Sequence, residues 1–192
     1  KFVHSLEQKP AMLTATVGQI GLRKGQNVLA EAAERFLPHL PDWHCLIIGE
    51  RHSGKDESLM FERQIAQRFR DAGFANRLHL LGYRSDMVRL LSEIDLLIHP
   101  ARQEPLGRVL LESAASGVPI VATGVGGTSE ILEDGVSARL LPPDDPRKLA
   151  AAVLDMARDA DLRQRLSSAA RVRMENSFDL RTSAARLAAE WN

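Results

Sequence analysis

The most informative stretch of this sequence is Glu104-Pro105-Leu106-Gly107-Arg108-Val109-Leu110-Leu111-Glu112. It follows a strand-like apolar run and opens a helix that we expect to continue to about residue 116. Pro105 has a fixed φ and no amide hydrogen, so it suits a first helical turn, and Gly107 has no side chain to block an approaching group. Because a helix N-terminus carries unpaired N–H donors and partial positive charge, the stretch predicts an anion site.

Two carboxylates, Glu104 and Glu112, flank this helix start. If the stretch is mostly helical, its eight steps at about 1.5 Å of rise cover roughly 12 Å, which is similar to the reach of a nucleotide sugar. One carboxylate would then accept hydrogen bonds from hexose hydroxyls and the other from ribose hydroxyls, with the diphosphate on the amides between them. The alternative is an ordinary amphipathic helix that carries two solvated glutamates.

The rest of the chain alternates between short apolar runs and segments with helical spacing. We expect strands over residues 12–17, 44–49, 77–82, 95–99, 118–123 and 137–141. Helices are expected over residues 28–36, 57–72, 86–92 with Ser85 as N-cap, 105–116, 129–132, 146–158, 160–174 and 179–191. This alternation predicts an α/β fold: a doubly wound, parallel, six-stranded Rossmann-like sheet with helices on both faces and extra C-terminal helices.

The candidate binding residues follow the ends of the predicted strands, where doubly wound sheets bind ligands. The turn from Gly18 to Gly25 carries Arg23 and Lys24, two cations placed against the dipole of the next helix, which indicates an anionic ligand. Its spacing is G-x-x-G-x-x-x-G, which fits neither a dinucleotide fingerprint nor a P-loop. The alternative for this turn is a loop with solvated basic residues.

Two further pairs of residues are candidates on weaker grounds, and one histidine is not. Gly126 and Gly127 repeat the order of strand, glycine turn and helix, although a plain tight turn also favours glycine. Tyr83 and Arg84 follow the third strand, where backbone groups would reach the edge of a base, with simple packing of Tyr83 as the alternative. His99 ends the fourth strand and is interpreted as a structural histidine, because the six histidines show no spacing for a metal site or a catalytic triad.

Composition and charge describe an ordinary globular chain. Of 192 residues 44% are hydrophobic, and 25 basic residues balance 25 acidic ones, so no global field favours nucleic acid or an acidic membrane. The one cysteine, Cys45, suits strand packing and a reducing compartment, so we expect a cytoplasmic location. No apolar run approaches the roughly 18 residues of a membrane span. Residues 1–11 are expected to form a linker from a missing N-terminal domain, and residues 12–192 a nucleotide-sugar-binding domain.

At this point the ordered motifs resemble those of a known family. They are Val17-Gly18 with Lys24-Gly25, Gly82 with Asp86, Asp95 with Pro100, Glu104-Pro-Leu-Gly107 with Glu112, Gly117-Val-Pro-Ile-Val121, and Gly126-Gly127 with Glu130. Together, in this order and spacing, they resemble the C-terminal, donor-binding domain of group 1 retaining glycosyltransferases of the GT-B fold.

The resemblance implies a role for each matching residue. Glu104 and Lys24 would be catalytic, with Glu104 on the donor hexose and Lys24 on the diphosphate. Gly107, Arg108 and Val109 would bind the donor through backbone amides, and Glu112 would bind the ribose. The remaining donor-binding candidates are Gln19, Arg23, Tyr83, Arg84, Gly126 and Gly127.

The resemblance also implies what the chain needs and lacks. The family uses a nucleoside diphosphate sugar such as a UDP-sugar as substrate, transfers the sugar with retention, and generally needs no metal or other cofactor. Its acceptor, in some members membrane-associated, binds mainly to an N-terminal domain, so the chain alone is expected to be inactive. The family often has Arg where Gln19 stands, and Gln supplies hydrogen bonds but no charge, a loss for which Arg23 is the candidate compensation.

Two other functions are alternatives. A nucleotide-sugar epimerase half would have the same fold, and its distinguishing residues would lie outside this chain. A non-catalytic nucleotide-binding module, such as a receiver-like domain, predicts an acidic cluster after the first strand, where Gly18 and Gln19 stand. If the last helix returns to an N-terminal domain as in the family, some of Phe178, Leu180, Leu187 and Trp191 should be exposed.

Overall fold

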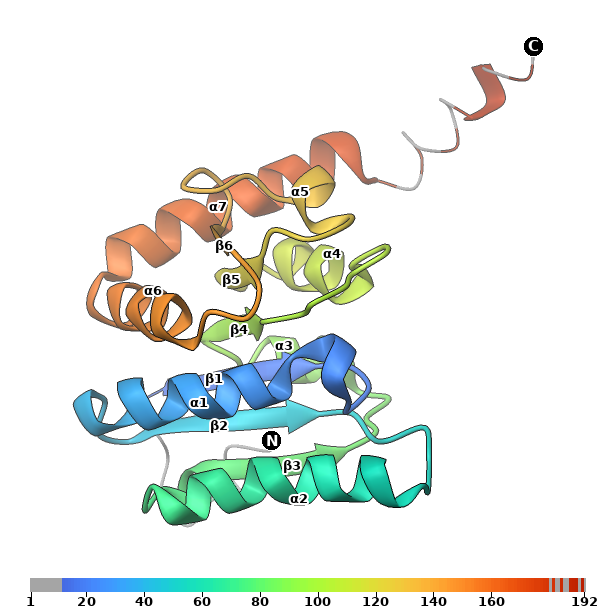
Figure 1. Ribbon diagram of the computed structural model, residues 1–192. Helices are drawn as coiled ribbons and strands as arrows, with labels where there is room; N and C mark the ends of the chain where they lie inside the picture. Colours follow the sequence, from blue (N-terminus) through green and yellow to red (C-terminus); the bar gives the residue numbers. More distant parts are fainter. Residues whose placement is uncertain (1–11, 180, 182–183, 185–186, 190, 192) are drawn as a thin grey trace.

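The protein forms one parallel sheet with helices on both faces (Figure 1). The computed structural model describes residues 12–179, 181, 184, 187–189 and 191. Its strands are β1 (Met12–Val17), β2 (Trp43–Ile48), β3 (Leu78–Gly82), β4 (Leu96–His99), β5 (Ile120–Thr123) and β6 (Arg139–Leu141). Every strand lies within two residues of its predicted bounds, because each is a short apolar run bounded by turn residues.

The strand order is β3-β2-β1-β4-β5-β6, and all pairs are parallel. β1 lies at the centre, with Thr14 opposite Cys45 of β2 on one side and Leu96 of β4 on the other. The chain runs outward from β1 to β3 and then returns to place β4 on the other side of β1. This reversal is the point where doubly wound sheets bind their ligands, and the predicted fold is confirmed.

The helices alternate with the strands. They are α1 (Gln26–Phe36), α2 (Asp56–Asp71), α3 (Met87–Leu91), α4 (Arg108–Ala115), α5 (Thr128–Ile131), α6 (Pro146–Arg158) and α7 (Ala160–Ser177), with 3₁₀ turns η2 (Leu22–Lys24), η3 (Leu37–His39) and η4 (Ala75–Arg77). Two of the helices have side-chain caps: Asp145 accepts from the Lys148 amide at 2.9 Å and Asp159 from the Leu162 amide at 2.8 Å. These caps define where α6 and α7 begin.

Two hydrophobic clusters hold the helices on the sheet. One joins β2 to α1, α2 and α6 through residues such as Phe36, Ile65 and Met156. The other joins β4 and β5 to α3, α4 and the second half of α7 through Leu90, Leu110 and similar residues. Figure 1 shows α1, α2 and α6 in front of the sheet and α3 and α4 behind it. The helix that follows β1 and the helix that follows β4 therefore cover opposite faces, which leaves a gap beyond the carboxyl ends of these two strands.

Two predicted helix starts were wrong. The residue at the N-cap of α3 is Asp86 rather than Ser85, and neither side chain caps the helix. α4 begins at Arg108 and not at Pro105, because Gly107 adopts a left-handed conformation with φ of 70° that a right-handed helix cannot contain. Pro105 and Leu106 therefore belong to the loop that leads to the helix.

The end of the chain agrees with its prediction where it is described. Phe178, Leu187 and Trp191 are exposed, as expected, and Leu180 lies outside the described residues. Within the helix predicted over 179–191, residues 181, 184 and 187–189 are helical. The linker predicted over residues 1–11 lies outside the described part of the chain.

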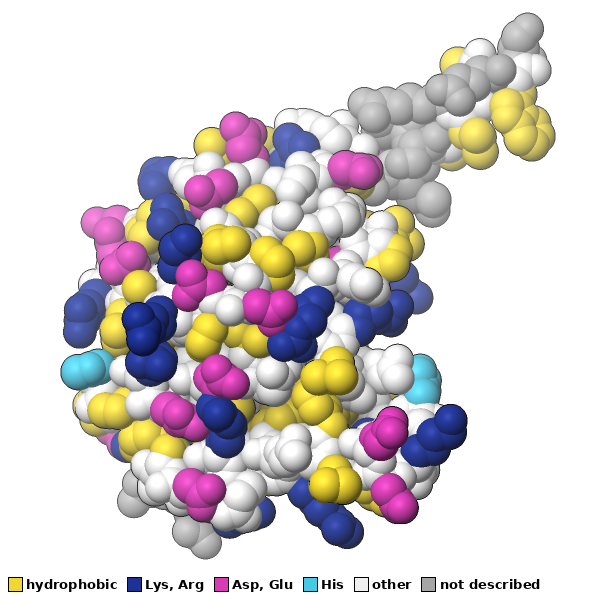
Figure 2. Space-filling view, in the orientation of Figure 1, with side chains coloured by type: hydrophobic (Ala, Val, Ile, Leu, Met, Phe, Trp, Pro, Cys, Tyr) yellow, Lys and Arg dark blue, Asp and Glu magenta, His cyan; other side chains and the backbone are white. Residues whose placement is uncertain are grey.

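Surface charge is balanced on the face that Figure 2 shows, where acidic and basic side chains alternate. Burial raises the pKa of the Cys45 thiol to about 12, which fits its predicted role in strand packing. In the described part of the chain, no helix is both long and apolar enough to cross a membrane.

Candidate functional site

A large pocket lies at the reversal of strand order, beyond the carboxyl ends of β1 and β4. Its volume is about 980 Å³. Its walls come from the turn after β1, the loop after β3 with α3, and the loop after β4 with the first turns of α4. The predicted site residues that line it are Arg23, Lys24, Tyr83, Arg84, Glu104, Gly107, Arg108, Val109 and Glu112.

Glu104 and Glu112, the two carboxylates flanking the start of α4, line this same pocket. Glu104 is only 6% exposed, which rules out the alternative of two solvated glutamates. Glu112 is exposed, and its Oε1 lies 3.4 Å from Nη2 of Arg108, one helical turn away. The buried acid is therefore fixed by the fold, whereas the outer acid faces the pocket from the surface of α4.

The carboxylate of Glu104 has three partners. Its Oε2 accepts from Nζ of Lys24 and pairs with Nε2 of His99 at 2.6 Å, and its Oε1 accepts from the Gly107 amide at 3.0 Å. The His99 hydrogen bond, with help from Lys24 and the Gly107 amide, outweighs burial and holds the pKa of Glu104 well below its usual range. Glu104 is thus a firmly ionised acid with fixed geometry.

His99 does more than the structural role that the sequence predicted. It is 1% exposed at the end of β4, and it holds Glu104 instead of only filling the core. A histidine five residues before the key acid, at the last position of a buried strand, was the signal available in the sequence.

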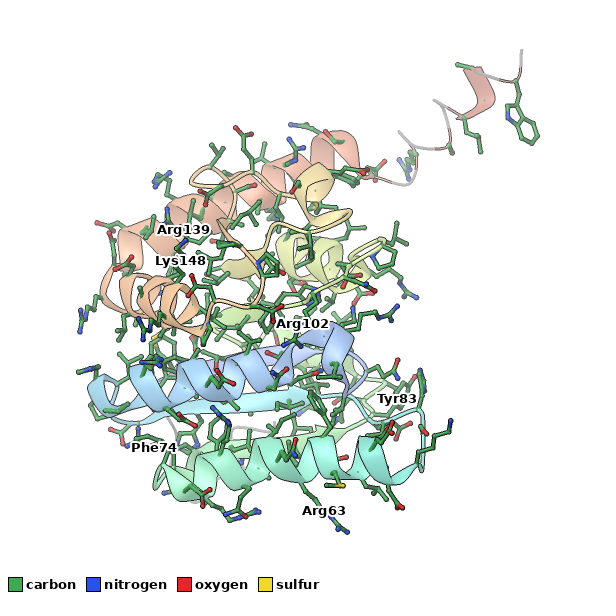
Figure 3. All side chains as sticks on the ribbon, in the orientation of Figure 1. Arg63, Phe74, Tyr83, Arg102, Arg139 and Lys148 are labelled. Atoms are coloured by element: carbon green, nitrogen blue, oxygen red, sulfur yellow. The ribbon has the colours of Figure 1, made fainter. Side chains whose placement is uncertain are left out.

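The turn that carries Lys24 is locked against the loop that carries Glu104. Gly25 has a φ of 69°, and a Cβ added there would lie 1.9 Å from the carbonyl oxygen of Pro100. Arg102 donates from Nη1 to the Leu22 carbonyl at 2.6 Å and to Asn27 Oδ1 at 3.0 Å, and its Nε lies 2.7 Å from Asp144. In Figure 3, Arg102 lies beside the first turn of α1. Lys24 is therefore placed by the packing, and the alternative of a solvated basic loop does not hold for it.

Fewer backbone amides are available at the start of α4 than the three that were expected. Gly107 already donates to Glu104, so its amide is not available to a ligand. The amides of Arg108 and Val109 have no acceptor among the described residues, because the fourth residue back along the chain is not helical. The anion site predicted for this helix start therefore consists of two amides rather than three.

The cations of the pocket differ in how they are paired. Arg84 makes a two-bond contact with Asp86 at 2.8 and 2.7 Å, and Lys24 is paired with Glu104. Arg23 has no carboxylate partner within the described ranges. Arg23 is thus the lining cation best able to meet an incoming anion.

Tyr83 is 71% exposed, which excludes the alternative that it only packs in the core. Figure 3 shows it just beyond the end of β3. It contributes to the rim of the pocket together with Val88 of α3 and Leu106 of the loop after β4, both also exposed.

Three predicted site residues do not line the pocket. Gln19 uses its carbonyl to accept from Gln26 Nε2 at 2.9 Å. Gly127 donates its amide to the Glu104 carbonyl at 2.8 Å, and a Cβ on Gly126 would lie 2.3 Å from that oxygen. The two glycines therefore support Glu104 from behind, because only residues without side chains let the two loops approach so closely.

No group of three or more His, Cys, Asp or Glu side chains in the described residues is arranged to hold a metal ion. Glu104 and Glu112 are instead paired with Lys24 and Arg108. Such a site offers fixed amide donors, ammonium and guanidinium groups for phosphate, and carboxylates for hydroxyl groups.

Comparison with known sequences gives a consistent family. The chain matches the family "Glycosyl transferases group 1" over residues 2–173. It is 32% identical over 143 residues to the lipopolysaccharide core biosynthesis mannosyltransferase LpsB of Rhizobium meliloti, covering 72% of this chain and 40% of the relative. It is 31% identical over 169 residues to glycogen synthase of Mycobacterium tuberculosis, covering 88% and 39%. The chain thus spans about two-fifths of the length of these curated relatives.

Solved structures give the same result. The structure of Anabaena Alr3699/HepE in complex with UDP and glucose has a TM-score of 0.88 and 25% identity, over 99% of this chain and 50% of that one. The C-terminal domain of a group 1 family glycosyl transferase (LpcC) from Francisella tularensis has the same fold, with a TM-score of 0.82 and 22% identity over 89% and 88% of the two chains. On the match across nearly its whole length, this chain belongs to the group 1 glycosyl transferases.

Proposed function

We propose that this chain binds the nucleoside diphosphate sugar donor of a retaining glycosyltransferase that moves a hexose to an acceptor. The observation that carries the proposal is a convergence of groups in one pocket at the reversal of strand order. They are two acids, two amides without an acceptor in the described residues, and Arg23, which has no carboxylate partner there. These are the groups that a sugar diphosphate needs, and they come from two connections, the turn after β1 and the loop after β4 with α4.

The diphosphate is placed at the start of α4. The free amides of Arg108 and Val109 point along the axis of a helix whose N-terminus attracts anions. Arg23 and Lys24 line the facing wall and supply positive charge. These groups stabilise the negative charge that develops on the departing nucleoside diphosphate, so the reaction needs no metal or other cofactor.

The two sugars are assigned to the two acids. Glu112 faces the pocket from the second turn of α4 and accepts hydrogen bonds from the ribose hydroxyls. Glu104 lies deeper and accepts from the hexose, so it and Lys24 are the catalytic residues of this half. Tyr83 and Arg84 lie where the base would sit.

The comparisons favour UDP as the nucleotide. Structures of the Anabaena protein were solved with UDP and with UDP-glucose, at TM-scores of 0.86 and 0.85 to this chain. The remaining catalytic groups and the acceptor site, including any for a membrane-associated acceptor, are assigned to an N-terminal domain, so the chain alone turns over little donor. The transfer is assigned to the cytoplasm.

Calorimetric titration of the chain with UDP, UDP-glucose, GDP-mannose and ADP-glucose tests the proposal. We expect UDP and UDP-glucose to bind, and Glu112→Gln to weaken both by on the order of tenfold, as loss of a charged hydrogen-bond acceptor predicts. Glu175→Gln is the matched control, because Glu175 pairs with Arg171 one turn away at 3.1 Å, as Glu112 does with Arg108. Absence of binding by all four ligands, or equal effects of the two variants, would contradict the proposal.

A further inference from the structure

The partners of Glu104 lie at two depths. Lys24 lines the pocket, and its side chain is 14% exposed. His99 is 1% exposed, does not line the pocket, and contacts Glu104 from the strand behind it. A ligand that enters the pocket therefore meets Lys24 but not His99.

An entering diphosphate competes with Glu104 for Lys24. The ammonium is on a flexible four-carbon stem and carries three donors, so it can turn toward a phosphate. The Oε2 atom of Glu104 then loses one of its two partners and regains an acceptor position. This acceptor position faces the pocket, because Lys24, which occupied it before, lines the pocket.

We propose that His99 is a positioning residue that holds Glu104 while Lys24 changes partner, so that the vacated side of Oε2 accepts a hydroxyl of the donor hexose. This inference rests on the proposed function. An ionised carboxylate only accepts hydrogen bonds, so Nε2 of His99 carries the hydrogen. The Gly107 amide holds Oε1 at 3.0 Å, and the two bonds together fix the plane of the carboxylate.

The surroundings of His99 suit this role. Its Nδ1 is buried and has no partner in the described residues, so Glu104 is the one group to which the ring is tied. His99 is the last residue of β4, and its backbone lies opposite Ala122 of β5. Because the ring is buried at the end of a central strand, we expect it to stay in place when a ligand binds. It can therefore hold the carboxylate of Glu104 in one orientation.

Two substitutions distinguish a role of His99 in positioning Glu104 from a role in packing alone. His99→Leu keeps an apolar side chain of similar bulk but removes the donor, whereas His99→Gln retains an N–H donor at a similar reach. The probes are UDP and UDP-glucose, titrated calorimetrically into the wild-type chain and both variants, with thermal unfolding to confirm that each variant folds. We expect His99→Leu to weaken UDP-glucose by on the order of tenfold and UDP by less than about threefold, as loss of one charged hydrogen bond predicts.

We also expect His99→Gln to restore most of the preference for the sugar nucleotide. A purely structural role would lower both affinities together, and Gln would not rescue them selectively. An unchanged ratio of UDP-glucose to UDP affinity in His99→Leu therefore overturns the proposal while leaving the proposed function intact. A wild-type chain that binds neither probe overturns the proposed function, and this inference with it.

A second readout needs no ligand. In a chain labelled with ¹³C at the glutamate side chains, the Glu104 carboxyl signal of the wild type should titrate at a lower pH than that of His99→Leu, because His99 is the largest cause of the lowered Glu104 pKa. His99→Gln should lie between the two. Identical titration curves in all three proteins would show that His99 does not control this carboxylate.

Discussion

Lys24 and Glu104 form an ion pair that joins the turn after β1 to the loop after β4, the two connections that diverge from the centre of the sheet. Eighty residues separate them in the chain, yet their side chains meet at the base of the pocket. The pair is surrounded by backbone contacts that leave little freedom to either loop. We therefore expect distinct effects from changes at Glu104, Gly25, Arg102 and Arg23.

Glu104 should make the stability of the chain depend on pH. Its folded-state pKa lies below the ordinary value of 4.5, so its ionised form stabilises the fold above that pH, and the contribution is lost as the pH falls through the folded pKa. We expect Glu104→Gln to lower the free energy of unfolding by about 1–3 kcal/mol at pH 7 and by less at pH 3. Urea unfolding at both pH values measures this, with Glu175→Gln as an exposed control. A loss that is equal at both pH values would argue against the assignment.

Gly25 should tolerate no side chain. Gly25→Ala places a Cβ against the Pro100 carbonyl at 1.9 Å, so the two loops must separate, and we expect a loss of more than about 3 kcal/mol. Gly135 has a similar φ of 72° and open space around it, so Gly135→Ala should cost only the backbone strain of about 1–2 kcal/mol. The denaturant midpoints of the two variants give the comparison. Equal losses would mean that the close approach of the loops is not needed.

Arg102 should matter although it does not line the pocket. Arg102→Ala removes its contacts to Leu22, Asn27 and Asp144, and we expect a stability loss of about 1–3 kcal/mol together with weaker UDP binding. Arg102→Lys keeps the charge but loses the fork of donors, so it should recover only part of the effect. Arg171→Ala, on the exposed surface of α7, is the control in thermal unfolding and calorimetry. Unchanged UDP affinity in Arg102→Ala would separate this clamp from the site.

Arg23 should supply much of the salt dependence of nucleotide binding. It is the lining cation without a carboxylate partner in the described residues, so Arg23→Gln should weaken UDP by on the order of tenfold at low salt and by less at high salt. Arg147→Gln, an exposed change on α6, should leave the affinity unchanged. Calorimetry at two salt concentrations measures the difference. If Arg23→Gln had the same salt dependence as the wild type, the diphosphate would have to bind elsewhere.

Much of the fold could be predicted because β1, β2, β4 and β5 are apolar runs that only a covered parallel sheet accommodates. The position of the pocket followed from the same reasoning, since Lys24, Glu104 and Glu112 all come after central strands. The start of α4 was not predictable, because whether Gly107 begins a helix or precedes it depends on its left-handed φ. In this conformation the Gly107 amide donates to Glu104.

The internal partners of the site residues were equally hidden. The bond from His99 to Glu104 depends on where the loop after β4 folds back. The positions of Gly126 and Gly127 depend on contact between this loop and the loop after β5. Gln19 was expected to face the ligand, but its backbone is held by Gln26 and it does not line the pocket. Spacing along a chain predicts which loops meet, but not which atoms of each loop turn inward.

The base of the pocket and its rim should differ in how well they tolerate substitution, because three glycines lie behind the base. A Cβ added at Gly25, Gly126 or Gly127 would collide with backbone atoms of the loop after β4, so donor preference cannot readily be altered at these positions. Tyr83, Val88 and Leu106 stand at the mouth with most of their surface in solvent, where a change of size or polarity disturbs nothing beneath. Libraries intended to redirect this scaffold toward other sugar nucleotides should therefore be concentrated on those three positions.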